Sequence, residues 1–310
     1  MIAAARVLVV GDANPDLLLR GDVVPRFGQA EQLLDAADLV LGGSAAIMAC
    51  GLARLGVSTA LAAVVGDDVF GRQVLDELAA AGVSLEAMQT RPGEATGLSV
   101  HLAVPGDRAI LTLPGTIPAL DAVTVRAAVE IVHPTHVHVA SPFLIPALAS
   151  TLPDLLAQWR LAGIKSSLDP NWDPSERWDA IAAALPDLDL LFPNGEELAA
   201  IAAAAAPGAA DAAMALAGLG PRVVVKDGAE GGWSLDAAGA RHTARGLQVD
   251  VVDTTGAGDS FDAGYLAALI HGVIDEDQRL RWATVAGSLS TRGPGGTSAQ
   301  PSLDELRAAL

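Results

Sequence analysis

Cysteine and positive charge are both scarce in this chain. The single cysteine, Cys50, rules out an internal disulfide and is typical of a reducing compartment, so we expect a cytoplasmic protein. Lys and Arg number 19 against 37 Asp and Glu, and the formal net charge is −18. Such an acidic chain gains nothing from the phosphates of nucleic acid or from an anionic membrane surface. We therefore expect neither as a partner.

The chain also lacks an uninterrupted apolar segment long enough to cross a bilayer. The stretch 131–153 contains no Asp, Glu, Lys or Arg, but four prolines and three histidines interrupt it. The early apolar run ends at Gly11 and Asp12, too soon for a secretory signal. Neither stretch predicts a membrane or targeting segment.

What the chain has in abundance is apolar residues: 51% are hydrophobic and 18% are charged over 310 residues. This composition predicts a large buried core rather than disorder. Apolar strand-like runs alternate with helical stretches, beginning with a fully apolar strand at Arg6–Val10. The alternation predicts an α/β protein with a mostly parallel sheet and helices on both faces. We expect a single catalytic domain over 1–310, with a small β lid formed by about 14–38 and 96–114.

One stretch dominates the rest, the run Asp253-Thr254-Thr255-Gly256-Ala257-Gly258-Asp259-Ser260-Phe261. It is predicted to link a strand to a helix through a tight glycine turn. Gly256 and Gly258 allow a ligand to approach the backbone closely. The first N–H groups of a helix have no intrahelical acceptor, and the helix dipole adds positive charge there. The turn therefore predicts an anion-binding cradle.

Asp259 distinguishes this cradle from the better-known phosphate loops. No lysine follows the glycines, as a P-loop requires, and Phe261 stands where a dinucleotide fingerprint needs a small residue. A carboxylate inside an anion site fits a general base that takes the proton of an attacking hydroxyl. The N–H groups of Gly256, Ala257 and Gly258 would then stabilise the transferred group. The alternative is an ordinary glycine turn with Asp259 as a helix-start residue.

The whole string resembles the carboxy-terminal signature of the ribokinase-like, or PfkB, family of carbohydrate kinases. A second match is the diglycine Gly42-Gly43 opening a helix that ends at Gly56. The resemblance covers nearly the whole chain. It implies a ribokinase-like three-layer sandwich and transfer of a phosphoryl group from ATP, with Mg²⁺, to a hydroxyl group.

The resemblance also implies roles for other residues. Asn14, Asp16, Gly42 and Gly43 would bind the substrate, since an Asn-x-Asp in this family hydrogen-bonds sugar hydroxyls; turn chemistry is the alternative for the first two. Asn194 and Glu197 would support Mg²⁺ and phosphate, although an ordinary helix cap has the same spacing. Lys226 and Gly228 would contact the nucleotide, with a solvated strand-end lysine as the alternative. Asp253 and Thr255 resemble positions that bind a monovalent cation such as K⁺, completed from the loop 291–302.

Two departures from the family pattern bear on the substrate. Ile47 stands where the family usually has Asn, and Asp173 stands where some members have Arg. If both side chains face the pocket, they disfavour acidic sugars and sugar phosphates. We therefore predict an ATP-dependent kinase of a small neutral sugar or sugar-like compound. The alternatives are a nucleoside kinase, or a member of the fold that binds a ligand without turnover. An open lid sheet could also pair with a second copy to form a homodimer.

Overall fold

The computed structural model describes residues 6–29, 31–104 and 107–310. Its centre is an eight-stranded sheet in the order β14-β13-β12-β11-β10-β9-β1-β4, with parallel pairing from β12 through to β4 and antiparallel pairing of β13 and β14 at one edge. This confirms the mostly parallel sheet. The strands are β1 (Arg6–Val10), β4 (Ser58–Ala62), β9 (His136–Ala140), β10 (Lys165–Asp169), β11 (Leu190–Leu191), β12 (Arg222–Lys226), β13 (Gly232–Leu235) and β14 (Arg241–Ala244).

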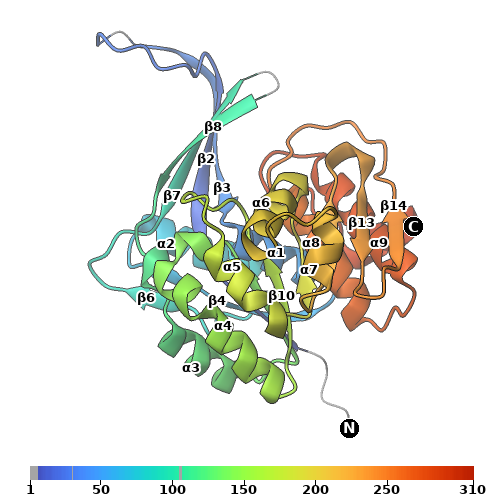
Figure 1. Ribbon diagram of the computed structural model, residues 1–310. Coiled ribbons are helices and arrows are strands. Elements are labelled where there is room, and N and C mark those ends of the chain that lie inside the picture. The colour runs from blue at the N-terminus through green and yellow to red at the C-terminus, as the bar shows by residue number, and fades with distance from the viewer. Residues whose placement is uncertain (1–5, 30, 105–106) are drawn as a thin grey trace.

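Helices cover both faces of this sheet, which gives the three predicted layers (Figure 1). Along β1 the side chains alternate: Leu8 and Val10 pack in one core, and Val7 and Val9 in the other. The first core includes residues of α3 (Ala122–Val132), α4 (Pro146–Leu161), α5 (Asp179–Ala184), α6 (Gly195–Ala205) and α7 (Ala212–Ala217). The second includes residues of α1 (Ser44–Arg54), α2 (Val69–Ala80), α8 (Ala257–Ile270), α9 (Glu276–Ser290) and α10 (Leu303–Ala309). Within the described residues, no helix is both long and apolar enough to span a bilayer.

A second sheet of four strands projects from this body as the lid (Figure 1). It has the order β3-β2-β7-β8, and is built from β2 (Asn14–Gly21), β3 (Leu34–Gly42), β7 (Leu98–Val104) and β8 (Asp107–Leu113). Both predicted lid segments contribute strands, and β3 runs beyond the predicted boundary to Gly42. The short strands β5 (Val64–Gly66) and β6 (Gln89–Arg91) pair separately as a two-stranded sheet.

The two faces of the lid sheet have opposite character. Residues paired across neighbouring strands share a face, so the register Asp16↔Ser99 and Leu18↔His101 places these side chains together, and all four are buried. We call this the polar lid face. The other face carries apolar residues at most positions of the same register, among them Leu17, Leu19, Leu39, Leu98, Val100, Leu102, Leu111 and Leu113. We call it the apolar lid face, and Leu39, Leu111 and Leu113 on it are exposed.

Candidate active site

The carboxyl ends of β1, β9, β10 and β12 meet beneath the lid. The chain leaves β1 toward β4 on one side and returns to β9 on the other, so β1 lies at the point where the strand order reverses. Ligands of open α/β sheets bind at such a point. The structure brings most of the predicted site residues to this place.

The anion cradle is the amino-terminal end of α8. Gly256 precedes the helix in a left-handed conformation with φ of 70°, and a Cβ there would lie 2.7 Å from the Cα of Gly296. Both features exclude other residues at this position. The N–H of Ala257 donates to the carbonyl of Thr254 at 3.2 Å and so closes the turn that leads into the helix. The cradle thus forms where predicted, in the first turn of a 14-residue helix.

Asp259 lies in this first turn and its side chain is held from across the site. The hydroxyl of Ser44, the first residue of α1, donates to the Asp259 carboxylate. The amide of Asn171 in turn donates to the hydroxyls of Ser44 (3.0 Å) and Ser141 (3.2 Å). Asn171 and Ser141 have φ of 50° and 51°, in the left-handed region, at the ends of β10 and β9. Such conformations gather at functional sites, where the surrounding fold enforces them.

Its surroundings make Asp259 a weaker acid than an ordinary carboxyl group. Desolvation, and next the negative charge of Asp169, raise its pKa to about 7. The hydrogen bond from Ser44 and the charge of Lys226 act in the opposite direction and are outweighed. A carboxylate with a pKa near 7 is well matched to accept a proton near neutral pH.

Lys226 lies inside the protein rather than at the surface. Its Nζ is 2.6 Å from a carboxylate oxygen of Asp169 and 3.6 Å from one of Asp262, which is on α8 one turn beyond Asp259. The carboxyl group of Asp262 is fully buried beside Lys226 and Asp169, and this burial raises its pKa well above the usual range. The alternative of a solvated strand-end lysine at 226 is therefore wrong.

The side of the site under the lid carries Asn14 and Asp16. Nδ2 of Asn14 is 3.0 Å from Oδ1 of Asp16, and Nε2 of His101 is 3.3 Å from Oδ2. A Cβ on Gly42 would lie 2.1 Å from the Cγ of Asp16, so the carboxyl group occupies the space that glycine leaves. Gly43 follows with φ of 84° immediately before α1. These residues sit together as the sequence predicts.

Asp12 is a site residue that the sequence analysis missed. Its two carboxylate oxygens accept from the N–H groups of Ser44 and Ala45, both at 3.1 Å, and so cap α1 from 32 and 33 residues away. Burial raises its pKa. The sequence did contain a signal for it: Asp12 is an acidic residue just after the buried strand β1, which ends at the same edge of the sheet as Asn14.

Asn194 and Glu197 form a reciprocal helix cap. The Asn194 side chain accepts from the N–H of Glu197 at 2.9 Å, and the Glu197 carboxylate accepts from the N–H of Asn194 at 2.8 Å. The ordinary cap considered as the alternative is thus present. Burial, and next the charge of Asp169, raise the pKa of Glu197. A role in binding Mg²⁺ stays a prediction.

A cavity of about 570 Å³ opens beside the cradle. Its lining includes Lys226, Gly228 and Gly258, together with the apolar side chains of Leu247, Val249 and Phe261. This size and lining suit a nucleotide base and ribose. Gly228 lines this cavity, and its contact with a nucleotide stays a prediction.

The proposed cation position lies in the turn before α8. The Asp253 carboxylate accepts from the N–H and the hydroxyl of Thr255, at 2.8 and 2.7 Å, and from the N–H of Gly295 at 2.9 Å. The loop 291–302 therefore does come to this turn, as the resemblance implies. Asp253 also anchors the loop through its N–H, which donates to the carbonyl of Thr291 at 3.1 Å.

The two departures from the family pattern do not face the substrate side. The Asp173 carboxylate accepts from Ser175 and from the N–H groups of Arg177 and Trp178, so it closes a local turn. Ile47 is 3% exposed and packs beneath the cradle, where its side chain would meet a Cβ on Gly256 or Gly296. The assumption that both side chains face the pocket is wrong.

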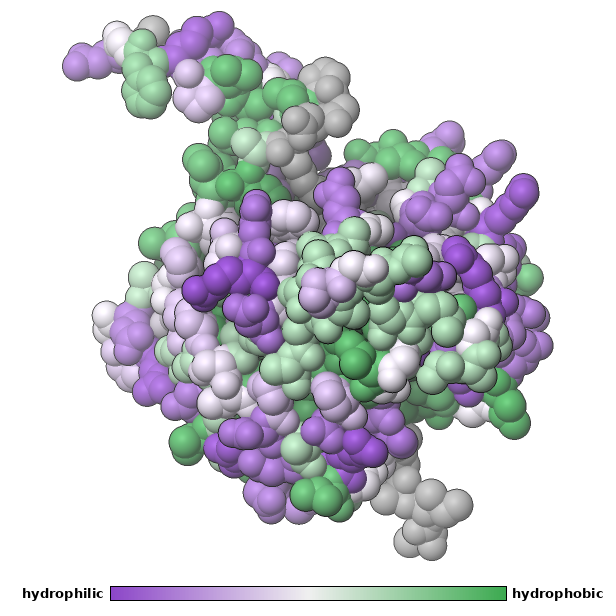
Figure 2. Space-filling model, viewed as in Figure 1, coloured by the Kyte–Doolittle hydropathy of each residue, from purple (hydrophilic) through white to green (hydrophobic). Residues whose placement is uncertain are grey.

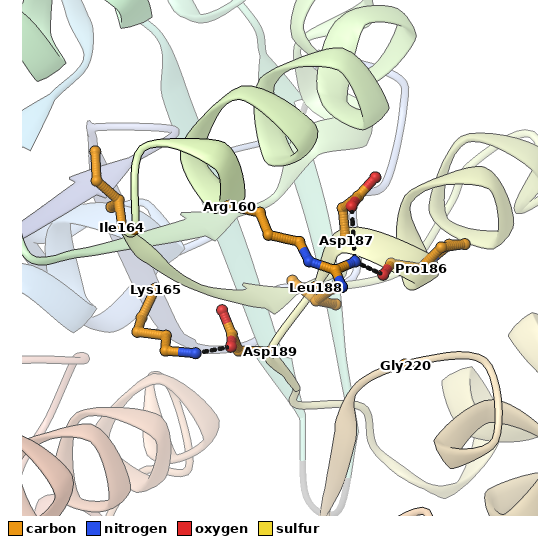
Figure 3. Close-up of a pocket in the computed structure, with 9 residues that line it drawn as sticks. Arg160, Ile164, Lys165, Pro186, Asp187, Leu188, Asp189 and Gly220 are labelled. Carbon is orange, nitrogen blue, oxygen red and sulfur yellow. Dashed lines mark hydrogen bonds and ion pairs between the residues drawn. The ribbon is translucent and has the colours of Figure 1, made fainter.

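Another cavity lies at the opposite, amino-terminal edge of the sheet, and none of the predicted site residues lines it. In Figure 3 its charged side chains are paired with one another: Arg160 with Asp187 at 3.0 Å, and Lys165 with Asp189 at 2.7 Å. Because these charges are paired with each other, they are not available to bind a charged ligand. The site under the lid is therefore the better candidate for the functional site.

Comparison with known proteins agrees with this geometry. The chain is 33% identical over 312 residues to the ATP-dependent ribose-1-phosphate kinase of Halopiger xanaduensis, covering 98% of each. Its fold matches the structure of Arabidopsis thaliana ribokinase complexed with ribose and ATP, with a TM-score of 0.84, 25% identity and 98% of each chain covered. It also matches a fructokinase double mutant from Vibrio cholerae O395 with fructose, ADP and potassium ion bound, with a TM-score of 0.80, 25% identity and 98% of each chain covered.

Fold and relatives together define a phosphotransferase with an alcohol group as acceptor, built on the ribokinase-like fold. The model of the pfkB family of carbohydrate kinases matches residues 4–303. The chain belongs to that family. It is an ATP-dependent sugar kinase.

Proposed function

We propose that this protein transfers the γ-phosphoryl group of ATP to a hydroxyl of a neutral sugar, with Asp259 as general base. The observation that carries the proposal is the position of Asp259, a carboxylate with a pKa of about 7 in the first turn of α8, oriented by Ser44. Asp259 takes the proton of the attacking hydroxyl, while the N–H groups of the cradle meet the charge on the transferred group. Asn14, Asp16, Gly42 and Gly43 bind the sugar.

Mg²⁺ would neutralise charge on the phosphates during transfer. Among the described residues no group of three His, Cys, Asp or Glu side chains is arranged as a metal cage. This suits Mg²⁺, which keeps several waters and is held mainly through phosphate oxygens. Glu197 and Asn194 at the start of α6 would hold those waters.

The charges around the site favour a neutral acceptor. Asp12, Asp16 and Asp259 all approach the place where the sugar binds, and the ammonium of Lys226 is already paired with Asp169. Among the side chains that the structure describes, an acidic sugar or a sugar phosphate would meet this negative charge with Lys226 already paired. The polar lid face also offers hydrogen-bonding groups where a nucleoside kinase would need an apolar pocket for the base.

A panel of acceptors tests the proposal. ADP release is measured with ribose, fructose, polyols, adenosine, ribose 1-phosphate, fructose 1-phosphate and 2-keto-3-deoxygluconate, against an ATP-only blank. We expect a neutral sugar or polyol to have the highest kcat/KM. If a sugar phosphate had the highest kcat/KM, the proposed neutral substrate would be wrong, but the kinase activity would still hold. ADP release that no acceptor stimulates would indicate a ligand-binding member without turnover.

We expect the pH profile of the reaction to report Asp259. Only the ionised carboxylate accepts a proton, so kcat/KM should fall about tenfold per pH unit below pH 7, where the group becomes protonated. The rate should be level above that point. Initial rates between about pH 5 and pH 9, followed by a direct ADP assay, give the profile. If the rate fell only at about pH 4, the usual pKa of Asp, the environment of Asp259 would not raise its pKa as described.

We also propose that Asp253 and Thr255 hold a monovalent cation beside the cradle. Replacing a bulky organic cation by K⁺ at constant ionic strength should raise kcat several-fold, because the ion orders the N–H groups that meet developing charge. The Asp253→Asn variant should lose this response. Equal rates in both salts would remove the cation site and leave Asp253 as a turn residue.

Finally, we propose that two copies pair through the apolar lid face. Figure 2 shows hydrophobic residues gathered on the stem of the lid. On the apolar lid face, Leu111 and Leu113 of β8 are 60% and 55% exposed. We expect sedimentation equilibrium to give twice the chain mass of 31.4 kDa, and the Leu113→Asp variant to give the single mass. Leu161→Asp, at a leucine 90% exposed on α4, is the matched control and should leave the mass unchanged. A single mass for the unaltered chain would exclude the dimer.

A further inference from the structure

His101 is a polar residue of the lid that the reaction proposed above does not use. It lies on β7, on the polar lid face, with Nε2 3.3 Å from Oδ2 of Asp16. The other oxygen of that carboxylate, Oδ1, has Nδ2 of Asn14 at 3.0 Å. Each oxygen therefore has one protein donor beside it. Since a carboxylate oxygen accepts two hydrogen bonds, each oxygen keeps room for one more donor.

The second nitrogen of His101 is what makes the residue informative. His101 is 6% exposed, and its Nδ1 has no hydrogen-bond partner among the described residues. If Nε2 donates to Asp16, the neutral ring carries its proton there and Nδ1 is a bare acceptor. Buried acceptors are nearly always satisfied in native proteins, by protein, water or ligand. This one lacks only the donor.

Neighbouring groups on the polar lid face have already found partners. The hydroxyl of Ser99 lies 3.1 Å from that of Thr112 and 3.4 Å from Nδ2 of Asn14. The residues opposite His101 in the sheet are Leu18 and Ile110, neither of which has a polar side chain. The sheet itself therefore offers Nδ1 no donor. The donor must come from what the lid covers.

We propose that His101 determines which sugars this site accepts, with Nε2 orienting Asp16 and Nδ1 accepting the hydrogen of a substrate hydroxyl. The inference deepens the proposed function and rests on it. Asp16 and Nδ1 together take only hydrogens, so the substrate must present donors on this side. A polyhydroxylated neutral sugar does so, with two hydroxyls for Asp16 and a third for His101. A phosphate or carboxylate group at the same place presents acceptors and is refused.

Two substitutions separate the roles of the ring. His101→Leu removes both nitrogens, and His101→Gln keeps one donor and one acceptor. For His101→Leu we expect the KM of the preferred sugar to rise about 10- to 100-fold, the range for lost hydrogen bonds to a charged group, with the KM of ATP unchanged and kcat within a few-fold. His101→Gln should fall between. The control is His242→Gln, the same change in another histidine–aspartate pair, 2.8 Å from Asp277 at the far edge of the body, and should behave as the unaltered chain.

Deoxy sugars identify the contact. The deoxy analogue that lacks the hydroxyl bound by His101 should already have a high KM with the unaltered chain, and His101→Leu should raise that KM little further. For the other deoxy analogues, His101→Leu should raise the KM as much as it does for the complete sugar. An equal penalty on every analogue would mean that the substitution only disturbs the lid, and would overturn the proposal. So would an unchanged sugar KM.

A ligand-independent measurement keeps the inference separate from the proposed function. Long-range ¹H–¹⁵N spectra of the unaltered chain should show His101 with its proton on Nε2, and a proton on Nδ1 overturns the proposal whatever the enzyme does. If the panel finds no turnover, the proposed function fails, and calorimetric sugar affinity replaces KM. Equal affinities for the unaltered chain and His101→Leu, or no sugar binding to either, then overturn the role of His101 as well.

Discussion

Replacing Asp259 by Asn should lower kcat by roughly 10²- to 10⁴-fold, the usual range for a lost general base. The amide can keep the hydrogen bond to Ser44, so the first turn of α8 should stay in place. Nucleotide affinity should be equal or higher, because a negative charge beside the γ-phosphate has been removed. Single-turnover rates and ATP binding by calorimetry measure the two effects separately.

Asp304→Asn is the matched control for this variant. Asp304 is also an acidic residue in the first turn of a helix, α10, but it is exposed and lies outside the site. Its kcat should equal that of the unaltered chain. If Asp259→Asn likewise retained most of its kcat, Asp259 would have no part in proton transfer and the cradle would act by binding alone.

A single added methyl group at Gly42 should impair sugar use almost as strongly. The new Cβ of Gly42→Ala would lie 2.1 Å from the Cγ of Asp16, far closer than atoms can approach, so the carboxylate must leave its place. Two charge-assisted hydrogen bonds to the sugar would be lost, at about 1.5–3 kcal/mol each. We expect kcat/KM for the sugar to fall about 10²-fold or more, with ATP affinity retained.

Gly218→Ala provides the control for this substitution. Gly218 follows α7 in an exposed helical conformation, and an added Cβ would approach only the carbonyls of its own helix, at 3.2 Å and beyond. Kinetic constants should not change there. If Gly42→Ala kept normal sugar kinetics, Asp16 would not be the group that binds the sugar, since its displacement is unavoidable.

The fold and the cradle could be predicted because their signals are local. The strand, turn and helix around Asp259 lie in one contiguous stretch, and the alternation of strands and helices fixes the layers. Asp12, Ser44 and His101 were missed because each acts on a group far away in the sequence: the bond from Ser44 to Asp259 spans 215 residues. For His101 a signal existed, since Ser99 and His101 are the polar members of an alternating apolar strand.

The errors have equally physical causes. Asp173 was assigned to the pocket from its place in a family pattern, but four hydrogen bonds to its carboxylate hold it in a turn. For Lys226 the sequence leaves a nucleotide contact and a solvated strand end both open, and only the fold reveals that Asp169, from a strand 57 residues earlier, neutralises it. Long-range charge pairs of this kind leave no local pattern to read.

The contrast between the two lid faces has a consequence for how the protein responds to dilution. If two copies pair as proposed, covering the exposed leucines of the apolar lid face adds stability that a single copy does not have. The thermal midpoint of the lid should then depend on protein concentration, whereas a self-sufficient monomer has a fixed one. At low concentration, free lids with bare apolar faces and open edge strands would also be prone to mispairing. Assembly would thus protect the chain from aggregation as well as complete its shape.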